Sequence, residues 1–183
     1  MTDVIPQTDP LALDRQVCFA LSIASRSVLA IYRPLLQPLG LTHPQYLAML
    51  ALWEHERLSV KELGELLQLD PGTMSPLLKR LEAIGYVTRR RDVNDERVLV
   101  VSLTQRGRAL RAEAEKIPPA IVEALGMGLD ELQHLHATLT RVIGAARGAA
   151  LTSACPCGRP ADAPSCRRRA GRRRGRPARG RRR

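Results

Sequence analysis

One cysteine, Cys18, stands alone in the first 154 residues, and Tyr32 follows it fourteen residues later. The run from Leu13 to Leu21 has the apolar spacing of a helix, and Tyr32 falls on the same predicted helix. At about 3.6 residues per turn and about 1.5 Å per residue, the two side chains share a side of the helix but lie about 21 Å apart. They cannot touch within one chain. Two antiparallel copies of the helix would bring Tyr32 of one copy toward Cys18 of the other.

Such a pairing would matter for thiol chemistry. A phenol that donates a hydrogen bond to a thiolate lowers the pKa of the thiol and raises its reactivity. Cys18 is therefore a candidate redox-sensing residue. A lone cysteine on an apolar helix can equally be a small buried hydrophobe, and the residues alone leave both interpretations open.

A second group of residues suits contact with DNA. An apolar set at helical spacing faces the core: Met74, Leu77, Leu78 and Leu81. The outward residues of the same helix are then Thr73, Ser75, Pro76, Lys79 and Arg80. Small polar groups near the start of a helix and basic groups one turn later suit insertion into the major groove.

Four arginines gather on a predicted hairpin just downstream: Arg89, Arg90, Arg91 and Arg97. Residues 79–111 hold nine basic and four acidic side chains. An arginine at the hairpin tip suits a narrow minor groove, and Asp95 could hold the Arg97 guanidinium in a bidentate pair. The alternative is a set of solvated charges that discourages aggregation at a sheet edge.

The elements that would position these residues begin with a long helix over residues 11–37. Asp9 and Pro10 are typical of a helix start, and Pro38 and Gly40 end the helix. Its apolar stripe consists of Leu13, Val17, Leu21, Ala24, Val28, Ile31 and Leu35.

Short helices and a hairpin follow. Thr42 with Gln45, and Ser59 with Glu62, form capping boxes, and Asp70 caps a further helix. The expected helices span residues 44–55, 60–69, 71–85, 104–125 with a weak point at 118–119, and 130–147 opened by Asp130 and Gln133; the expected strands span 86–88 and 98–101. This order predicts a mainly α fold with a β-hairpin wing, a winged helix-turn-helix.

The net charge of +11 belongs to the end of the chain. Residues 155–183 hold twelve arginines against Asp162, so the first 154 residues are neutral overall. We expect a flexible N-terminus over 1–10, a folded domain over 11–147 and a disordered Arg-rich tail over 148–183. The tail could hold phosphates nonspecifically or be a solvated appendage. Its three cysteines, Cys155, Cys157 and Cys166, fall short of a tetrahedral zinc set, and we expect no metal or cofactor.

Composition restricts the class of protein further. The chain is 44% hydrophobic but 3% aromatic, so its core should be aliphatic. No uninterrupted apolar run approaches the roughly 18 residues of a membrane span, and no signal peptide is visible. We therefore expect no membrane partner, a cytoplasmic location and reduced cysteines.

Four stretches have the most specific pattern: Leu13 to Leu21 around Cys18, Tyr32-Arg33-Pro34-Leu35-Leu36, Leu39 to Leu47, and the candidate DNA-binding segment from Asp70 through Asp95-Glu96-Arg97. At these residues the chain resembles the MarR family of winged-helix repressors, in particular its organic-hydroperoxide-sensing, OhrR-like branch. The likeness covers about residues 10–147. It implies an all-helical homodimer with a small wing, whose N- and C-terminal helices form the interface.

The resemblance also implies roles for single residues. Cys18 matches the peroxide-sensing thiol, and Tyr32 matches the first of two tyrosines that the partner subunit directs at it. His43 occupies the position of the second tyrosine. An imidazole can also donate to a thiolate, and a protonated one would depress the thiol pKa more strongly. His43 could also be only a first-turn helix residue. Residues 116–139 hold no resolving cysteine, so the chain resembles the one-cysteine type, in which a low-molecular-weight thiol reacts with the oxidised cysteine. The tail cysteines could instead resolve oxidised Cys18, or they could be incidental.

The expected activity is repression of a pseudo-palindromic operator by the reduced homodimer. An organic hydroperoxide would oxidise Cys18 to a sulfenic acid, a thiol would convert this to a mixed disulfide, and the operator would be released. One alternative is a repressor that a small aromatic ligand releases. The other is a thiol peroxidase, but no acid, base and oxyanion donors are apparent near Cys18, and we expect no enzyme.

Overall fold

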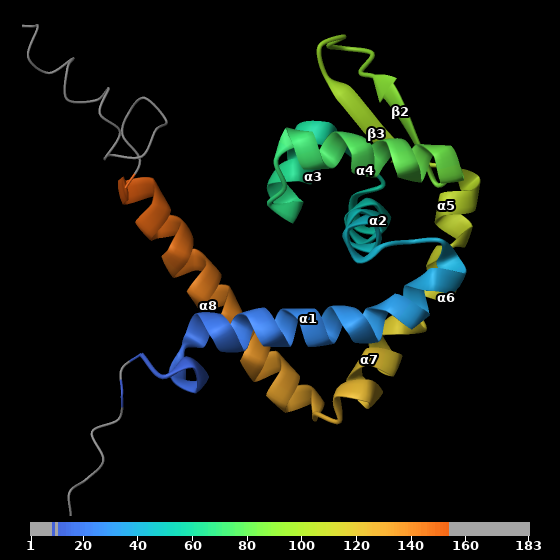
Figure 1. Ribbon diagram of the computed structural model, residues 1–183. Helices are drawn as coiled ribbons and strands as arrows, with labels where there is room; N and C mark the ends of the chain where they lie inside the picture. The colour runs from blue at the N-terminus through green and yellow to red at the C-terminus, as the bar shows by residue number, and fades with distance from the viewer. Residues whose placement is uncertain (1–8, 10, 154–183) are drawn as a thin grey trace, which may run out of the picture. The chain divides into compact units, whose positions relative to one another are not determined.

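The computed structural model describes residues 9 and 11–153, without the side chains of residues 150–153. The chain forms two units, residues 1–126 and 127–183, and each is described by itself. The described part of the first unit contains α1 to α7 and a small sheet, whereas that of the second contains α8 (Leu129–Ser153) (Figure 1).

The helices of the first unit are α1 (Val17–Leu36), α2 (His43–His55), α3 (Val60–Leu67), α4 (Pro71–Ile84), α5 (Gln105–Ala109), α6 (Arg111–Ala114) and α7 (Ile117–Leu125), with 3-10 turns η1 (Leu13–Arg15) and η2 (Gln37–Leu39) at the two ends of α1. Figure 1 shows the hairpin extending beyond α3 and α4. The predicted fold class, mainly α with a hairpin wing, is confirmed.

The sheet has three antiparallel strands, β1 (Arg57–Ser59), β2 (Val87–Arg91) and β3 (Leu99–Leu103), in the order β1-β3-β2. The hairpin of β2 and β3 was predicted, but β1 was not. Three residues directly after a helix are too few for an alternating pattern to be visible. Glu56, with φ of 57°, turns the chain out of α2 and into β1.

The first helix begins later than expected. Asp9 accepts a hydrogen bond from the main-chain nitrogen of Leu11 at 2.9 Å, so it stabilises a turn that precedes η1 rather than the start of α1. Pro10 lies outside the described residues. The predicted end is correct, because Gly40 has a left-handed φ of 67° after η2, a conformation that glycine adopts without strain.

Side-chain caps define the next three helices as predicted. Gln45 accepts the main-chain N–H of Thr42 at 2.8 Å, and Glu62 accepts that of Ser59 at 2.8 Å. At the start of α4, Asp70 accepts the main-chain N–H of Thr73 at 3.0 Å. These bonds pair N–H groups that a helix start leaves without intrahelical partners.

The helices after the wing differ from the prediction. The single helix expected over 104–125 is divided into α5, α6 and α7, with breaks around Leu110 and residues 115–116. Pro118 and Pro119 stand in the first turn of α7, where a missing N–H costs nothing. For α8 the cap is also different: Glu131, not Gln133, accepts the N–H of Gly128 at 2.9 Å, and the helix continues to Ser153.

The core of the first unit is aliphatic, as expected, and it supports α4. Met74, Leu78 and Leu81 are almost completely buried against side chains of α2, α3 and the sheet. By contrast, much of α1 is exposed. The segment Val17–Leu39 reaches the length and apolar composition of a membrane span, a test that core helices of soluble proteins also pass.

Candidate DNA-binding surface and thiol site

The outward face of α4 has the residues predicted for it. Thr73, Ser75, Pro76, Lys79 and Arg80 are all exposed, and the four apolar residues of the opposite face are buried. The hydroxyl of Thr73 donates to Asp70 at 2.7 Å, and this bond lowers the pKa of the Asp70 carboxyl. The oxygen of Thr73 therefore faces outward mainly as an acceptor.

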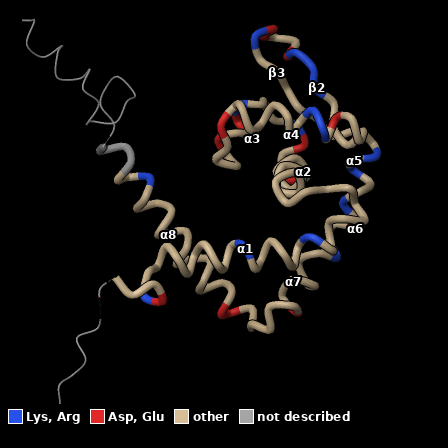
Figure 2. Tube along the Cα trace, viewed as in Figure 1, with Lys and Arg blue, Asp and Glu red and all other residues tan. Residues whose placement is uncertain are grey.

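The wing, which we define as β2, β3 and the turn between them, carries four arginines, and three acidic residues lie on its turn (Figure 2). Its arginines differ in their surroundings. The guanidinium of Arg89 donates from Nε at 2.9 Å and from Nη2 at 2.6 Å to the carboxylate of Glu82 on α4. Its side chain is only 19% exposed, and its hydrogen bond lowers the pKa of Glu82. Arg89 therefore joins β2 to α4, and its guanidinium is already engaged.

The turn of the wing is ordered by its own carboxylates. Asp92 accepts the main-chain N–H of Asn94 at 2.7 Å and forms an ion pair with Arg57 on β1. Asp95 accepts the main-chain N–H of Arg97 at 2.9 Å. The expected bidentate pair between Asp95 and the Arg97 guanidinium is not formed, because a two-residue spacing favours this local turn instead.

Four cations of this surface have no ion-pair or side-chain hydrogen-bond partner among the described residues: Lys79, Arg80, Arg90 and Arg97. All four are exposed, on α4 or on the wing. They are available for phosphates or base edges, whereas Arg91 donates to the main-chain carbonyl of Glu96 at 2.6 Å.

The thiol of Cys18 is exposed in the first turn of α1. Around it the helix presents an exposed apolar face that includes Val17, Leu21 and Leu29. Nothing in the described part of the chain buries this face, so the alternative that Cys18 is a core hydrophobe of the single chain does not hold.

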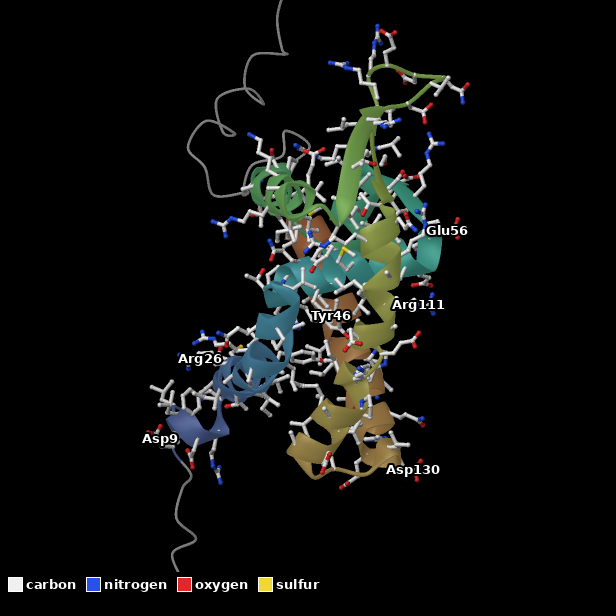
Figure 3. All side chains as sticks on the ribbon, turned by 90° about the vertical axis from the view of Figure 1, so that its right-hand side faces the viewer. Asp9, Arg26, Tyr46, Glu56, Arg111 and Asp130 are labelled. Carbon is white, nitrogen blue, oxygen red and sulfur yellow. The ribbon has the colours of Figure 1, made fainter. Side chains whose placement is uncertain are left out.

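Tyr32 lies near the other end of α1 and packs against α2. Its ring centroid is 4.8 Å from that of His43 in an edge-on arrangement and 6.0 Å from that of Tyr46. Tyr46, labelled in Figure 3 near the first turn of α2, is buried. Burial raises the pKa of Tyr32 and lowers that of His43, so both are held neutral and both are hydrogen-bond donors. Tyr46 was not predicted as part of the site, although its spacing of three residues from His43 places it on the same side of a helix.

A pocket of about 510 Å³ opens beside His43. Apolar side chains of α1 and of the segment after it, among them Leu29, Leu36 and Leu41, line the pocket together with Arg33. In the described part of the chain no group of three or more histidine, cysteine or acidic residues could hold a metal ion. The tail cysteines Cys155, Cys157 and Cys166 lie outside the described residues.

Known proteins with this arrangement are regulators of transcription. A sequence model of the MarR family matches residues 41–99. The organic hydroperoxide resistance transcriptional regulator of Bacillus subtilis is 45% identical over 131 residues, which are 72% of this chain and 89% of that protein. The chain belongs to the MarR family. The regulator TtmR of Methylorubrum extorquens is 50% identical over 127 residues, or 69% of this MarR-family chain and 65% of that protein.

Solved structures agree with this assignment. Reduced AbfR bound to DNA has a TM-score of 0.61 and 33% identity, over 73% of this chain and 93% of that chain. Overoxidised AbfR bound to DNA has a TM-score of 0.60 and 32% identity over the same shares; AbfR is a protein of Staphylococcus epidermidis. The resemblance inferred from the sequence is confirmed, and this chain is a transcriptional regulator of the MarR type.

Proposed function

We propose that this MarR-family regulator is a homodimeric repressor that releases its operator when an organic hydroperoxide oxidises Cys18. The observation that carries the proposal is the placement of the candidate residues at the two ends of α1. Cys18 is exposed at one end, while Tyr32 and His43 contact each other at the opposite end. An intersubunit site would unite the two halves.

The exposed apolar face of α1 supports a dimer. Val17, Leu21 and Leu29 lie on this side of the helix and are exposed in the single chain. Burying such side chains between subunits is favourable by about 25 cal/mol per Å² of apolar surface. Two antiparallel α1 helices would cover this face and bring Tyr32 and His43 of the partner subunit to Cys18.

The chemistry needs a thiolate and two donors. The Cys18 sulfur attacks the terminal oxygen of the hydroperoxide, the O–O bond breaks, and the leaving alkoxide takes up a proton and departs as the alcohol. The sulfur is then a sulfenic acid. A low-molecular-weight thiol attacks it, water leaves, and a mixed disulfide forms. Tyr32 and His43 would stabilise the reacting thiolate, and the bulk of the disulfide would separate them from it.

We assign the pocket beside His43 to the apolar body of the hydroperoxide. Its volume of about 510 Å³ lies within the range of about 300–1,000 Å³ that is usual for ligand sites. Leucine side chains dominate its walls, which suits an alkyl or aryl group.

On the DNA side we propose that α4 enters the major groove and that the wing reaches the minor groove. The contacts would come from Thr73, Ser75, Pro76, Lys79, Arg80, Arg90 and Arg97, and Arg89 and Asp95 would position them. Two such surfaces in a symmetric dimer match a double-stranded, roughly palindromic operator. A regulator that binds such an operator would act in the cytoplasm.

The direct test is Cys18→Ser. Operator affinity is measured by fluorescence anisotropy in the presence of a low-molecular-weight thiol, with and without one equivalent of cumene hydroperoxide. We expect wild type to lose at least about tenfold in affinity and the serine variant to bind equally in both conditions. The matched control replaces Cys155, Cys157 and Cys166 by serine and should respond like wild type. Release of the operator from Cys18→Ser after peroxide would refute the proposal.

Another pocket supports the alternative trigger, a small aromatic ligand that releases the operator. A space of about 430 Å³ is lined by the aromatic rings of Tyr46 and Trp53 and by Arg111, which Figure 3 labels. These groups suit a small aromatic acid, although Arg111 also pairs with Glu115 at 3.1 Å. Operator release by such a ligand from the Cys18→Ser variant would favour this alternative.

A further inference from the structure

After α4 the chain contacts the end of the helix that carries Cys18. Tyr86, the second residue after α4, is only 5% exposed. Its hydroxyl donates to the main-chain carbonyl of Leu39 at 2.9 Å. Leu39 is the last residue of η2, which directly continues α1. One hydrogen bond therefore joins the end of α1 to the exit of α4.

The exit of α4 is rigidly held on its other side by the first turn of α5. The hydroxyl of Thr104 donates to the carbonyl of Gly85 at 2.7 Å, and Arg106 donates to that of Ile84 at 2.7 Å. The guanidinium of Arg106 also lies 5.0 Å from the centre of the Tyr86 ring.

Gly107 completes this arrangement. A Cβ at position 107 would lie 2.0 Å from the carbonyl oxygen of Tyr86, so only glycine permits the close approach. The ring and the backbone of Tyr86 are thus packed tightly. Because packed interiors transmit displacements, the hydrogen bond to Leu39 offers a route by which a movement of Leu39 would shift Tyr86.

We propose that Tyr86 is a positioning residue that sets α4 against the end of α1, so that oxidation at Cys18 reaches the DNA-binding helix through the hydrogen bond from Tyr86 to Leu39. This inference rests on the proposed function, because it needs α1 to move when Cys18 is modified. It adds the route by which the movement reaches α4.

The test is Tyr86→Phe in the full-length chain. Phenylalanine fills the same space, and Leu39 is partly exposed, so water can bond its carbonyl and the fold should persist. The release factor is the ratio of operator Kd after and before oxidation by cumene hydroperoxide. We expect the release factor to fall about fivefold in the variant, which is the effect of losing one hydrogen bond. The rate of Cys18 oxidation, measured by mass spectrometry, should not change.

The matched control is Thr104→Val, which removes a hydroxyl bond to the same exit of α4 together with the α5 cap that accepts the N–H of Gly107. It should weaken operator binding similarly in both redox states and leave the release factor unchanged. A release factor in Tyr86→Phe equal to that of wild type would overturn this inference alone. So would an equal drop in Thr104→Val, because any loosening of the exit would then suffice. If wild type itself keeps its operator after oxidation, the proposed function fails and this inference fails with it.

Discussion

Residues of the same type on one hairpin have different roles, and their partners decide which. Arg89 donates twice to Glu82 and is mostly buried, whereas Arg97 is exposed and its guanidinium has no partner among the described residues. A sequence cannot separate them, because both are arginines at the edge of a short hairpin. The structure assigns a positioning role to the first, and we propose a DNA contact for the second.

Arg97→Ala should therefore weaken operator binding by about tenfold, as expected when one groove contact is removed, and leave the thermal unfolding midpoint unchanged. Arg89→Ala is the informative comparison. It should lower the free energy of unfolding by about 0.5–1 kcal/mol, because a partly exposed ion pair contributes little more. Anisotropy and thermal unfolding of both variants check this. Unchanged operator affinity in Arg97→Ala would remove Arg97 from the interface.

His43 gives a prediction for the pH dependence of stability. Burial lowers its pKa in the folded chain, so the unfolded chain binds a proton first as the pH falls below about 6.5. The free energy of unfolding therefore decreases as the pH falls below that value, because the unfolded state binds more protons than the folded state. Wild type should lose more thermal stability than His43→Gln between about pH 7.5 and 5.5. The carboxyls with lowered pKa, Glu62, Asp70, Glu82 and Asp92, respond at lower pH. An equal loss in both proteins would show that His43 is not desolvated.

At the scale of elements, the wing is attached to the domain at two points. Glu82 on α4 holds β2 through Arg89, and Arg57 on β1 holds the start of the turn through Asp92. The first pair connects the wing to α4, which carries DNA-facing residues, and the second connects it to β1. They should fix the direction of the wing more than they stabilise the fold.

The second attachment can be tested by exchanging charges. Arg57→Asp alone should weaken operator binding severalfold by loosening the turn, with little change in unfolding temperature, because exposed ion pairs add little stability. The double variant Arg57→Asp with Asp92→Arg restores the pair with opposite polarity and should recover part of the affinity. No recovery in the double variant would mean that Arg57 acts by another route, such as a phosphate contact of its own.

The elements that were predictable are those defined by local chemistry. Thr42, Ser59 and Asp70 mark the starts of their helices because a cap needs only residues within one turn. The strand β1 depends on pairing with β3, more than forty residues away, and could not be seen locally. Similarly, the breaks between α5, α6 and α7 follow from packing on the core, since nothing in the residues around Leu110 forbids a continuous helix.

The candidate site also has features that the sequence predicted and features that depend on packing between helices. The outward face of α4 followed from helical spacing, and the position of Cys18 and Tyr32 on one helix followed from apolar periodicity. The contact of Tyr32 with His43 and Tyr46 required the packing of α1 on α2, which no spacing within either helix contains.

At the scale of the whole molecule, charge is divided between a neutral first part and a strongly basic end. The net +11 of residues 155–183 lies outside the described residues, and the DNA-facing cations of α4 and the wing lie within them. A basic segment of this kind adds affinity for any DNA, because it releases counterions without reading bases.

Removal of residues 154–183 should therefore weaken binding to random DNA more than binding to the operator. The slope of log affinity against log salt should become shallower, by about 0.9 for each phosphate that the truncated chain no longer neutralises. Salt titrations of both chains on both DNAs measure this. An identical slope after truncation would mean that the end of the chain does not touch DNA.

In the proposed function, oxidation of the single thiol of Cys18 ends operator binding. A titration of the reduced full-length chain with an organic hydroperoxide, in the presence of a low-molecular-weight thiol, tests this by following operator binding and the mass of the peptide that contains Cys18. We predict that binding falls in proportion to the fraction of Cys18 oxidised and that release is complete near one equivalent per chain. Full oxidation of Cys18 with operator affinity retained would contradict the claim.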